Sequence, residues 1–293
     1  MLLGMLFSLG VHPAIAPVIS GASGEGSVVV APLAPNQWHP GERVEVASGW
    51  RGPSEETWAL EIARLVTVRI LTQNGSGSGV IVARQGETYT VLTNHHVVMD
   101  TPDQGYRVIT PDGQDYAAWW VPLPQFGDLD LALVQFTSRH SYRVAEIADS
   151  NAVLEGDPVY AAGFPAWYFH QEGDRLVAME DTRDWGVSAF RVTTGQVVMR
   201  SPRALQGGYQ IGYTNEVLQG MSGGPVVDRH GALIAINGKS KYPFQGIQAF
   251  IFADGSIPSW PLFQQMEALS WAIPIARFQQ KTWDRSQESP GGL

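Results

Sequence analysis

Short apolar segments alternate with turn-forming residues over most of the chain, from about residue 66 to residue 273. Segments of this kind, rich in Val, Ile, Thr and aromatic side chains, are typical of β-strands. A first group predicts strands at 66–71, 79–83, 89–93, 106–110, 117–121 and 131–136. A second group predicts strands at 158–162, 190–194, 196–199, 209–214, 224–227, 232–236, 247–252 and 269–273. Such a succession predicts an all-β protein of barrels or sandwiches, with Asp112-Gly113 as the turn of a hairpin.

Two segments outside this pattern have helical features. Ser54 is followed by two glutamates, and a capping residue followed by acidic residues is typical of the start of a helix. A helix beginning there is expected to pack through the face that carries Trp58, Ile62 and Leu65. A closing helix is predicted at 276–283, followed by a polar tail at 284–293.

The first 53 residues follow neither pattern. Residues 1–22 are mostly apolar and contain Ala14-Ile15-Ala16, which a signal peptidase can cut, so we expect a signal segment and an exported protein, periplasmic or secreted. No Lys or Arg precedes the apolar run, and a wrongly assigned start or an apolar tail is the alternative. Residues 23–53 are rich in Gly, Pro, Ser and Ala and predict a linker or extended arm. No later run reaches the roughly 18 apolar residues of a membrane span, so we expect no membrane insertion of the mature form.

Composition narrows the classes of partner. The 293 residues are 44% hydrophobic, enough to bury the core of one large or two small domains. The net charge of −9 repels nucleic-acid phosphates and anionic membranes, so we expect neither as a partner. The chain has no cysteine, which excludes disulfides, thiol catalysis and thiolate zinc sites.

The strongest chemical signal is the segment Gly220-Met221-Ser222-Gly223-Gly224-Pro225. A serine hydroxyl is a poor nucleophile and needs a neighbouring base, together with donors for the oxyanion that it creates. Glycines around Ser222 allow the N–H groups of Gly220 and Ser222 to converge and leave room for a carbonyl group. The alternative is a Gly-Pro turn between two strands. The choice depends on whether a base and an acid lie elsewhere in the chain.

Candidates for both lie upstream. His95 and His96 follow an apolar run, and Asp128 and Asp130 precede another. The chemistry of the side chains does not by itself choose between the two neighbouring histidines. A zinc site is disfavoured, because no H-E-x-x-H arrangement is present and no cysteine is available.

Together, Thr-Asn-His-His-Val, Asp-Leu-Ala-Leu and Gly-Met-Ser-Gly-Gly-Pro resemble the chymotrypsin/trypsin-like serine peptidases, which have the chain order His, Asp, Ser. The Thr-Asn-x-His-Val form without cysteines is most similar to the bacterial branch that includes periplasmic heat-shock proteases and glutamyl endopeptidases. The resemblance spans about residues 55 to 283. It implies two six-stranded antiparallel β-barrels over 54–145 and 146–283, an endopeptidase acting on protein or peptide substrates, and no cofactor. The PDZ domain of the heat-shock members is not expected, because few residues follow residue 283.

The resemblance also selects the site residues. The histidine three residues after the threonine is His96, and the acid directly before Leu-Ala-Leu is Asp130. The resemblance implies that Asp130 orients His96, that His96 activates Ser222, and that the N–H groups of Gly220 and Ser222 hold the oxyanion. Because a fold does not imply a function, a non-catalytic binding protein and a small-molecule esterase with the same triad are alternatives.

Three further expectations concern the segments around the triad. Glu216 lies six residues before the nucleophile, where a carboxylate at the floor of the S1 pocket would favour Lys or Arg at P1. A surface position for Glu216 would instead leave a pocket for small apolar or acidic side chains. Met221 stands where animal digestive members carry an aspartate that pairs with a newly cut N-terminus, so we expect the oxyanion loop to be held by packing, or to become ordered on substrate binding. Residues 75–79 lack the Lys-Ser or Lys-Thr of a phosphate loop and are expected to form a flexible turn.

Overall fold

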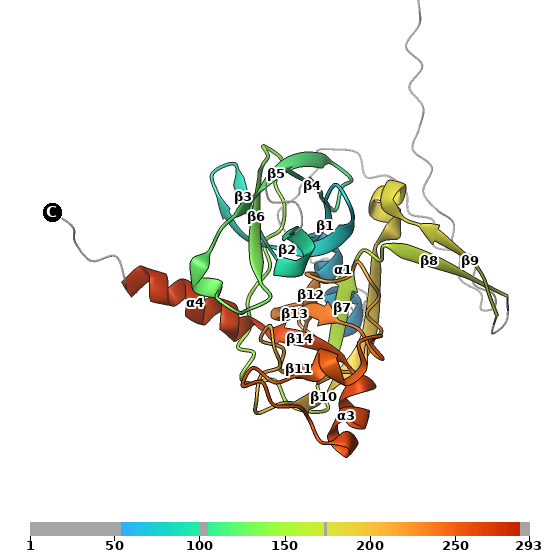
Figure 1. Ribbon diagram of the computed structural model, residues 1–293. Helices are drawn as coiled ribbons and strands as arrows, with labels where there is room; N and C mark the ends of the chain where they lie inside the picture. The colour runs from blue at the N-terminus through green and yellow to red at the C-terminus, as the bar shows by residue number, and fades with distance from the viewer. Residues whose placement is uncertain (1–53, 100–104, 173–174, 288–293) are drawn as a thin grey trace, which may run out of the picture. The chain divides into compact units, whose positions relative to one another are not determined.

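The computed structural model describes residues 54–99, 105–172 and 175–287. Two closed six-stranded antiparallel barrels form its centre (Figure 1). The expectation of two such barrels is therefore confirmed. The first barrel has the strand order β1-β2-β3-β6-β5-β4, with β1 at Thr67–Leu71, β2 at Ser76–Gln85, β3 at Thr88–Thr93, β4 at Tyr106–Ile109, β5 at Asp115–Val121 and β6 at Ala132–Thr137. The second has the order β10-β11-β14-β13-β12-β7, with β7 at Pro158–Gly163, β10 at Arg191–Arg200, β11 at Ile211–Tyr213, β12 at Pro225–Val227, β13 at Leu233–Lys239 and β14 at Ser270–Pro274.

The first barrel follows the predicted pattern closely. Each predicted strand overlaps an observed one. The turn predicted at Asp112-Gly113 joins β4 to β5, and the Gly113 N–H donates to the Thr110 carbonyl at 2.8 Å. The alternating side chains fill the barrel with aliphatic and aromatic groups, including the stacked pair Tyr89 and Phe136.

The second barrel departs from the prediction at two places. The strands predicted on either side of Gly195 are one strand, because β10 pairs without interruption with β7 from Arg191 to Gln196. The strand predicted at 247–252 is wrong, since Gly246–Phe250 forms the 3-10 helix η3. A short apolar run such as this one does not distinguish a strand from a helical turn. Phe250 is fully buried in the core from the helical conformation.

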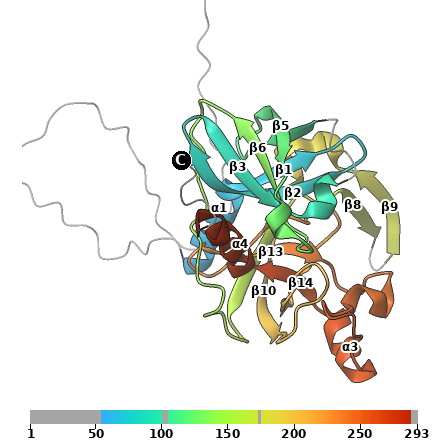
Figure 2. The same cartoon turned by 60° about the vertical axis from the view of Figure 1, so that its left-hand side comes forward.

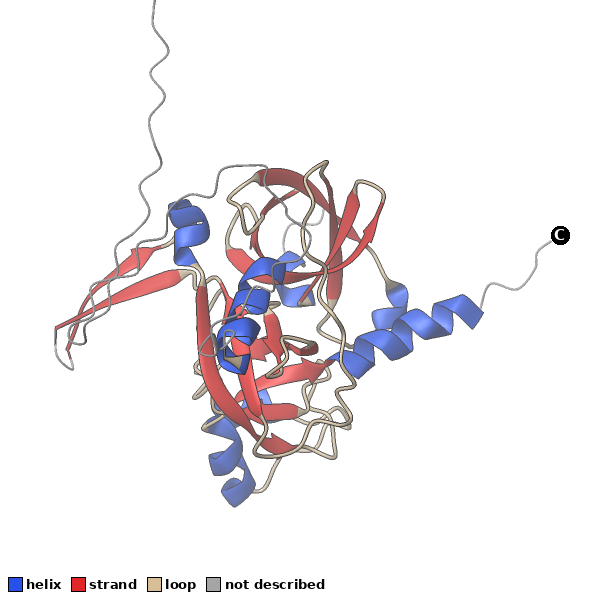
Figure 3. Ribbon diagram, turned by 180° about the vertical axis from the view of Figure 1, so that it is seen from behind, coloured by secondary structure: helices blue, strands red, loops and turns tan. Residues whose placement is uncertain are grey.

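Several elements were not predicted. Strands β8 (Trp167–Glu172) and β9 (Arg175–Asp181) pair as a hairpin that belongs to neither barrel (Figures 1 and 3). The 3-10 helix η2 (Arg183–Ala189) returns the chain from β9 to β10, and η1 (Pro124–Phe126) precedes β6. Helix α3 spans Trp260–Glu267 and buries Phe263 and Met266. The spacing of these two side chains, three residues apart after a Ser-Trp-Pro start, is a helix signal that the sequence contains.

The two predicted helices exist with different details. Helix α1 spans Glu55–Val66, and the Ser54 hydroxyl accepts the Thr57 N–H at 3.1 Å, so the predicted cap is confirmed. The predicted packing face is wrong by about one position, since Trp58 is 46% exposed and the buried residues are Ala59, Ile62, Ala63 and Val66. Helix α4 spans Ile275–Gln287, so the chain remains helical beyond residue 283, where a tail was expected.

The barrels meet through a shared cluster of buried side chains. A single cluster of buried side chains contains Val80 and Leu92 of the first barrel together with Leu233, Ile236 and Trp271 of the second. Figure 2 shows β13 and β14 beneath β1, β2 and β3. Loops that leave the facing ends of the two barrels are thereby brought together without a mobile linker between them.

The expected signal segment at 1–22 and linker at 23–53 lie outside the described residues. Among the helices of the described residues, none has the length and apolar character that a membrane span requires.

Candidate active site

His96 lies in a short helix directly after a strand of the first barrel. Strand β3 ends at Thr93, and α2 (His95–Val98) begins after Asn94. The Asn94 side-chain amide donates to the Asp130 carbonyl at 2.8 Å, which ties the start of the helix to the acid segment. His95 lies near Trp120, with ring centroids 5.9 Å apart. The two neighbouring histidines thus face different surroundings.

Asp130 holds His96 through both carboxylate oxygens. Oδ2 lies 2.7 Å from His96 Nδ1, and Oδ1 accepts the backbone N–H of His96 at 2.9 Å. The Tyr209 hydroxyl also donates to Oδ2, at 2.5 Å. Burial alone would raise the pKa of Asp130, but the hydrogen bonds from His96 and Tyr209 and the charge of His96 hold this pKa below its ordinary value. Asp128, the other acid candidate, is an exposed turn residue.

Ser222 is half-buried and lines one cavity of about 770 Å³ together with His96 and Asp130. Its carbonyl accepts the Ser78 N–H from the first barrel at 2.8 Å. The Ser78 hydroxyl donates to the Gly220 carbonyl at 2.8 Å and accepts the Phe164 N–H at 2.8 Å. Ser78 is fully buried, so the nucleophile segment is attached to the first barrel by groups that water does not reach.

The peptide between Gln219 and Gly220 has a defined orientation. The Gln219 carbonyl accepts the Ala166 N–H at 2.7 Å. Because the N–H and C=O of a trans peptide point in opposite directions, the Gly220 N–H points away from Ala166. Gly220 has φ of 94°, a conformation that a side chain would oppose. Within the described residues, the N–H groups of Gly220 and Ser222 have no hydrogen-bond acceptor, so both are free to bind an oxyanion.

Met221 contributes packing to this loop. Its side chain is fully buried in an apolar cluster with Val217, and Leu218 packs against that cluster. No charged group is needed at this position to order the loop. Of the two expected arrangements, the loop has the one in which packing holds it.

Residues 75–79 do not form the expected flexible turn, and this prediction was wrong. Residues 76–79 begin strand β2, which pairs with β1 from Ser76 onward. A Cβ atom on Gly77 would lie 2.5 Å from the Val97 side chain. The small residues allow β2 to pass under α2, which brings Ser78 to the nucleophile segment.

Glu216 is not brought together with the triad. It is exposed and lines a neighbouring cavity of about 440 Å³ with Trp167 and Phe169 of the hairpin. Glu216 therefore occupies the surface position that was the alternative to a charged S1 floor.

Three residues near the triad were not predicted: Ser78, Tyr209 and Lys239. Ser78 lies in the Gly-Ser segment that was interpreted as a turn, and Tyr209 follows two glycines as the first residue of the strand predicted at 209–214. Lys239 ends β13 and lines the triad cavity. The sequence has no local signal for their roles, because each acts through a partner that is distant along the chain.

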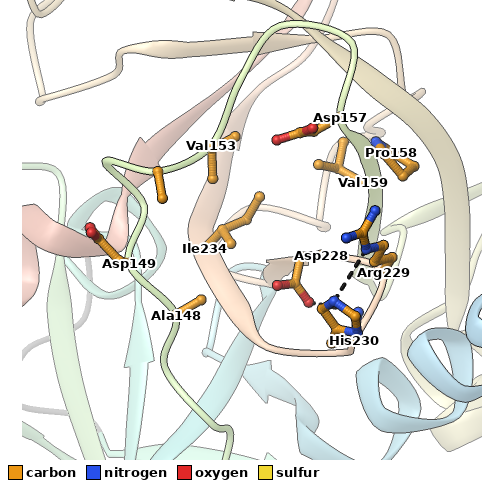
Figure 4. A pocket seen from close by; sticks show the side chains of 11 residues that line it. Ala148, Asp149, Val153, Asp157, Pro158, Val159, Asp228, Arg229, His230 and Ile234 are labelled. Carbon is orange, nitrogen blue, oxygen red and sulfur yellow. Dashed lines mark hydrogen bonds between the residues drawn. The ribbon is translucent and has the colours of Figure 1, made fainter.

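A further cavity, of about 260 Å³, lies among residues of the second barrel and the segment that precedes it (Figure 4). It contains charged side chains, and Arg229 Nε donates to His230 Nε2 at 3.1 Å. The carboxylates around it accept backbone N–H groups: Asp228 caps the turn at 228–232, and Asp157 accepts from Leu154. These groups stabilise turns, and none of the triad candidates lines this cavity.

The sequence of this chain is similar to those of known proteins. Residues 77–236 match the family model of the trypsin-like peptidase domain, which covers more than half of the chain. The chain belongs to the trypsin-like serine peptidase family, and the resemblance inferred from the sequence is confirmed.

Among its relatives, the serine protease Do-like HtrA of Bacillus subtilis is 28% identical over 174 residues, covering 57% of this chain and 34% of the relative. The probable periplasmic serine endoprotease DegP-like of Brucella suis is 30% identical over 195 residues, covering 66% of this chain and 32% of the relative. The matched part thus spans about a third of these relatives. The solved structure of an HtrA-type protease with a tripeptide has the same fold, with a TM-score of 0.52 and 21% identity over 76% of this chain and 60% of that chain.

Proposed function

We propose that this chain is a serine endopeptidase in which His96, Asp130 and Ser222 form the catalytic triad. The observation that carries the proposal is the His96–Asp130 pair at 2.7 Å, in one cavity with Ser222 and beside two free N–H groups. A nucleophile and an oriented base in one cavity, with unpaired N–H groups on the nucleophile segment, are the parts that acyl transfer requires.

In this proposal each residue of the triad has one role. Asp130 accepts the Nδ1 proton of His96, which leaves Nε2 as the basic nitrogen. His96 removes the proton from the Ser222 hydroxyl as Ser222 Oγ bonds to the scissile carbonyl carbon. The N–H groups of Gly220 and Ser222 stabilise the negative oxygen that forms. The C–N bond then breaks as His96 protonates the leaving amine, and water releases the acyl group by the same steps.

Proteins or peptides are the proposed substrates, and an exported location is proposed with them. The relatives are named serine proteases, and one of them is named a probable periplasmic endoprotease. The apolar segment at the start of the chain supports export independently.

A fluorophosphonate probe tests the proposal directly. We expect the protein to be labelled and to digest casein, and we expect Ser222→Ala to lose both activities, with turnover falling on the order of a million-fold as for other triad serines. Labelling with cleavage of small esters but not of casein would indicate an esterase instead. A folded protein that neither reacts nor cleaves would overturn the enzymatic proposal in favour of a binding protein.

A further inference from the structure

Tyr209 reaches from the second barrel to the candidate acid of the first. Its hydroxyl donates to Asp130 Oδ2 at 2.5 Å, and its side chain is 2% exposed. The same oxygen lies 2.7 Å from His96 Nδ1, and Oδ1 is occupied by the His96 backbone. We propose that Tyr209 is a positioning residue, which holds the Asp130 carboxylate in the orientation that directs His96 toward Ser222. This inference rests on the proposed peptidase function.

Two features of the backbone around Tyr209 allow its phenol group to reach the Asp130 carboxylate. The Asp130 N–H donates to the Gly207 carbonyl at 2.9 Å, which joins the loop before Tyr209 to the acid segment. On the other side, a Cβ atom at position 238 would lie 2.1 Å from the Tyr209 hydroxyl oxygen. Strand β13 therefore leaves room for the phenol only because residue 238 is glycine.

The charged and titratable groups around this contact come from three elements. His96 belongs to α2, Lys239 ends β13 with its ammonium 4.7 Å from the Tyr209 ring centroid, and Tyr213 belongs to β11. Burial raises the pKa of Tyr209 well above its ordinary value, and the Asp130 charge adds to this effect. The phenol therefore remains a donor at every pH at which the triad would act, and it spreads part of the carboxylate charge.

Tyr209→Phe removes the donor and keeps the ring. We expect kcat to fall about tenfold or more, because the hydrogen bond to the charged Asp130 carboxylate is lost. KM should stay within about twofold, because this hydrogen bond does not contact the substrate. We also expect the acid limb of the kcat/KM profile to move to higher pH by about half a unit, because the carboxylate then attracts the protonated imidazole more strongly. Gly238→Ala keeps the hydroxyl but displaces it, and should move the acid limb in the same direction.

Tyr89→Phe is the matched control. Tyr89 is a fully buried tyrosine of the first barrel whose hydroxyl donates to the His140 carbonyl at 2.9 Å, away from the triad. The Tyr89→Phe variant should have a lower melting temperature than wild type, and the acid limb of its kcat/KM profile should not move. Superimposable pH profiles for Tyr209→Phe and wild type would overturn the inference. A wild type that does not react with the fluorophosphonate would instead overturn the proposed function.

A second, independent observation concerns charge in the triad cavity. Lys239 lines this cavity, and its ammonium makes no hydrogen bond or ion pair with any residue that the structure describes. The one carboxylate among the lining residues, Asp130, is occupied by His96 and Tyr209. Burial lowers the pKa of Lys239, an effect that the charge of Asp130 partly offsets. An anion that entered the cavity would interact favourably with the ammonium of Lys239 and so compensate for the hydration that this group has lost.

We infer that Lys239 binds a carboxylate of the substrate, so that the proposed peptidase favours polypeptides with Asp or Glu close to the scissile bond. Glu216 does not oppose this preference within the cavity, since it lines the neighbouring one. Lys241, the other lysine nearby, is occupied, because its ammonium donates to the Thr214 carbonyl at 2.5 Å.

Paired peptides that differ only by Glu or Gln at one position, from P1 to P4, test this inference. At one position we expect wild type to have a kcat/KM about tenfold or more higher for Glu, the size of a charge-assisted contact. Lys239→Met should reduce this ratio to about one, and the control Lys241→Met should keep it. A ratio near one at all positions in an active wild type, or a ratio that persists in Lys239→Met, would refute the inference. Because the ratio compares two substrates of one variant, a general loss of activity does not affect it.

Discussion

The Ser78 hydroxyl provides a sharp test of how the two barrels cooperate. Ser78→Ala removes the donor to the Gly220 carbonyl and the acceptor of the Phe164 N–H, both at 2.8 Å. Both groups then lack a partner in a region that water does not reach. Each unsatisfied buried group costs about 1–3 kcal/mol, so the contact that joins the loop before Ser222 to Ser78 and Phe164 should be weakened by at least about 2 kcal/mol.

This free energy falls on the loop that carries the nucleophile and the Gly220 donor. A cost of about 2 kcal/mol changes the equilibrium constant between the competent loop and a displaced loop about 30-fold, since about 1.4 kcal/mol is tenfold. We therefore expect kcat/KM for peptides, and the rate of fluorophosphonate labelling, to fall by up to about 30-fold. This loss is smaller than the hundred- to thousand-fold loss that removal of an oxyanion donor causes in other serine peptidases.

Ser138→Ala is the matched control for this experiment. Ser138 is also a buried serine with two hydrogen bonds, one to the Tyr116 hydroxyl and one from the His140 N–H, both at 2.9 Å, but it lies away from the nucleophile. The Ser138→Ala variant should have a lower unfolding free energy than wild type, and its rate of fluorophosphonate labelling should stay within about twofold of wild type. Equal labelling rates for folded Ser78→Ala and wild type would refute the reasoning, because the loop would then not depend on the Ser78 hydroxyl.

Three further variants test the same geometry. Asp130→Asn should lower kcat about 10⁴-fold while the protein remains folded, because an amide does not select the required His96 tautomer; a loss of less than tenfold in steady-state assays would contradict this role. Since the pKa of Asp130 is held below its unfolded value, the ionised carboxyl stabilises the fold above that unfolded value, and the benefit is lost as the pH falls through the folded pKa. In urea unfolding, the difference in unfolding free energy between wild type and Asp130→Asn should therefore narrow from about pH 6 to about pH 3. A difference that stays constant over this range would contradict the lowered pKa of Asp130. Arg69→Met should lower the unfolding free energy by about 1–3 kcal/mol, because the buried guanidinium donates to the Thr182 carbonyl at 2.7 Å and hydroxyl at 2.9 Å; an unchanged urea midpoint would show that these contacts contribute nothing. Glu216→Gln should change kcat/KM for Lys or Arg at P1 by less than about threefold, because the charge of an exposed carboxylate is screened; a tenfold fall would restore the charged-floor interpretation.

The strand pattern of the sequence was sufficient to predict barrels or sandwiches, and the resemblance of three short segments to a known family added the two six-stranded barrels and the candidate triad. Strands of the first barrel alternate with clear turn residues such as Asp112-Gly113, and local alternation of this kind is readable without the tertiary structure. The segments around His96, Asp130 and Ser222 are also local patterns, and the structure brings all three residues to one cavity.

Local patterns were insufficient wherever packing chose between two conformations. The run 247–252 became a 3-10 helix because Phe250 fills the shared core from that conformation. Helix α1 turned a different face inward, burying Ala59 and Ala63 and leaving Trp58 exposed. Small residues on the buried face allow the helix to approach the second barrel closely, with which it shares a cluster of side chains.

Only the tertiary structure decided which groups support the triad. Ser78 and Tyr209 each act across the boundary between the barrels, on Gly220 and on Asp130. Neither contact has a sequence period or a motif, because its two partners are more than 70 residues apart and meet only when both barrels have closed. The chemistry of the reacting groups is thus encoded in short segments, whereas their orientation depends on hydrogen bonds that exist only in the folded chain.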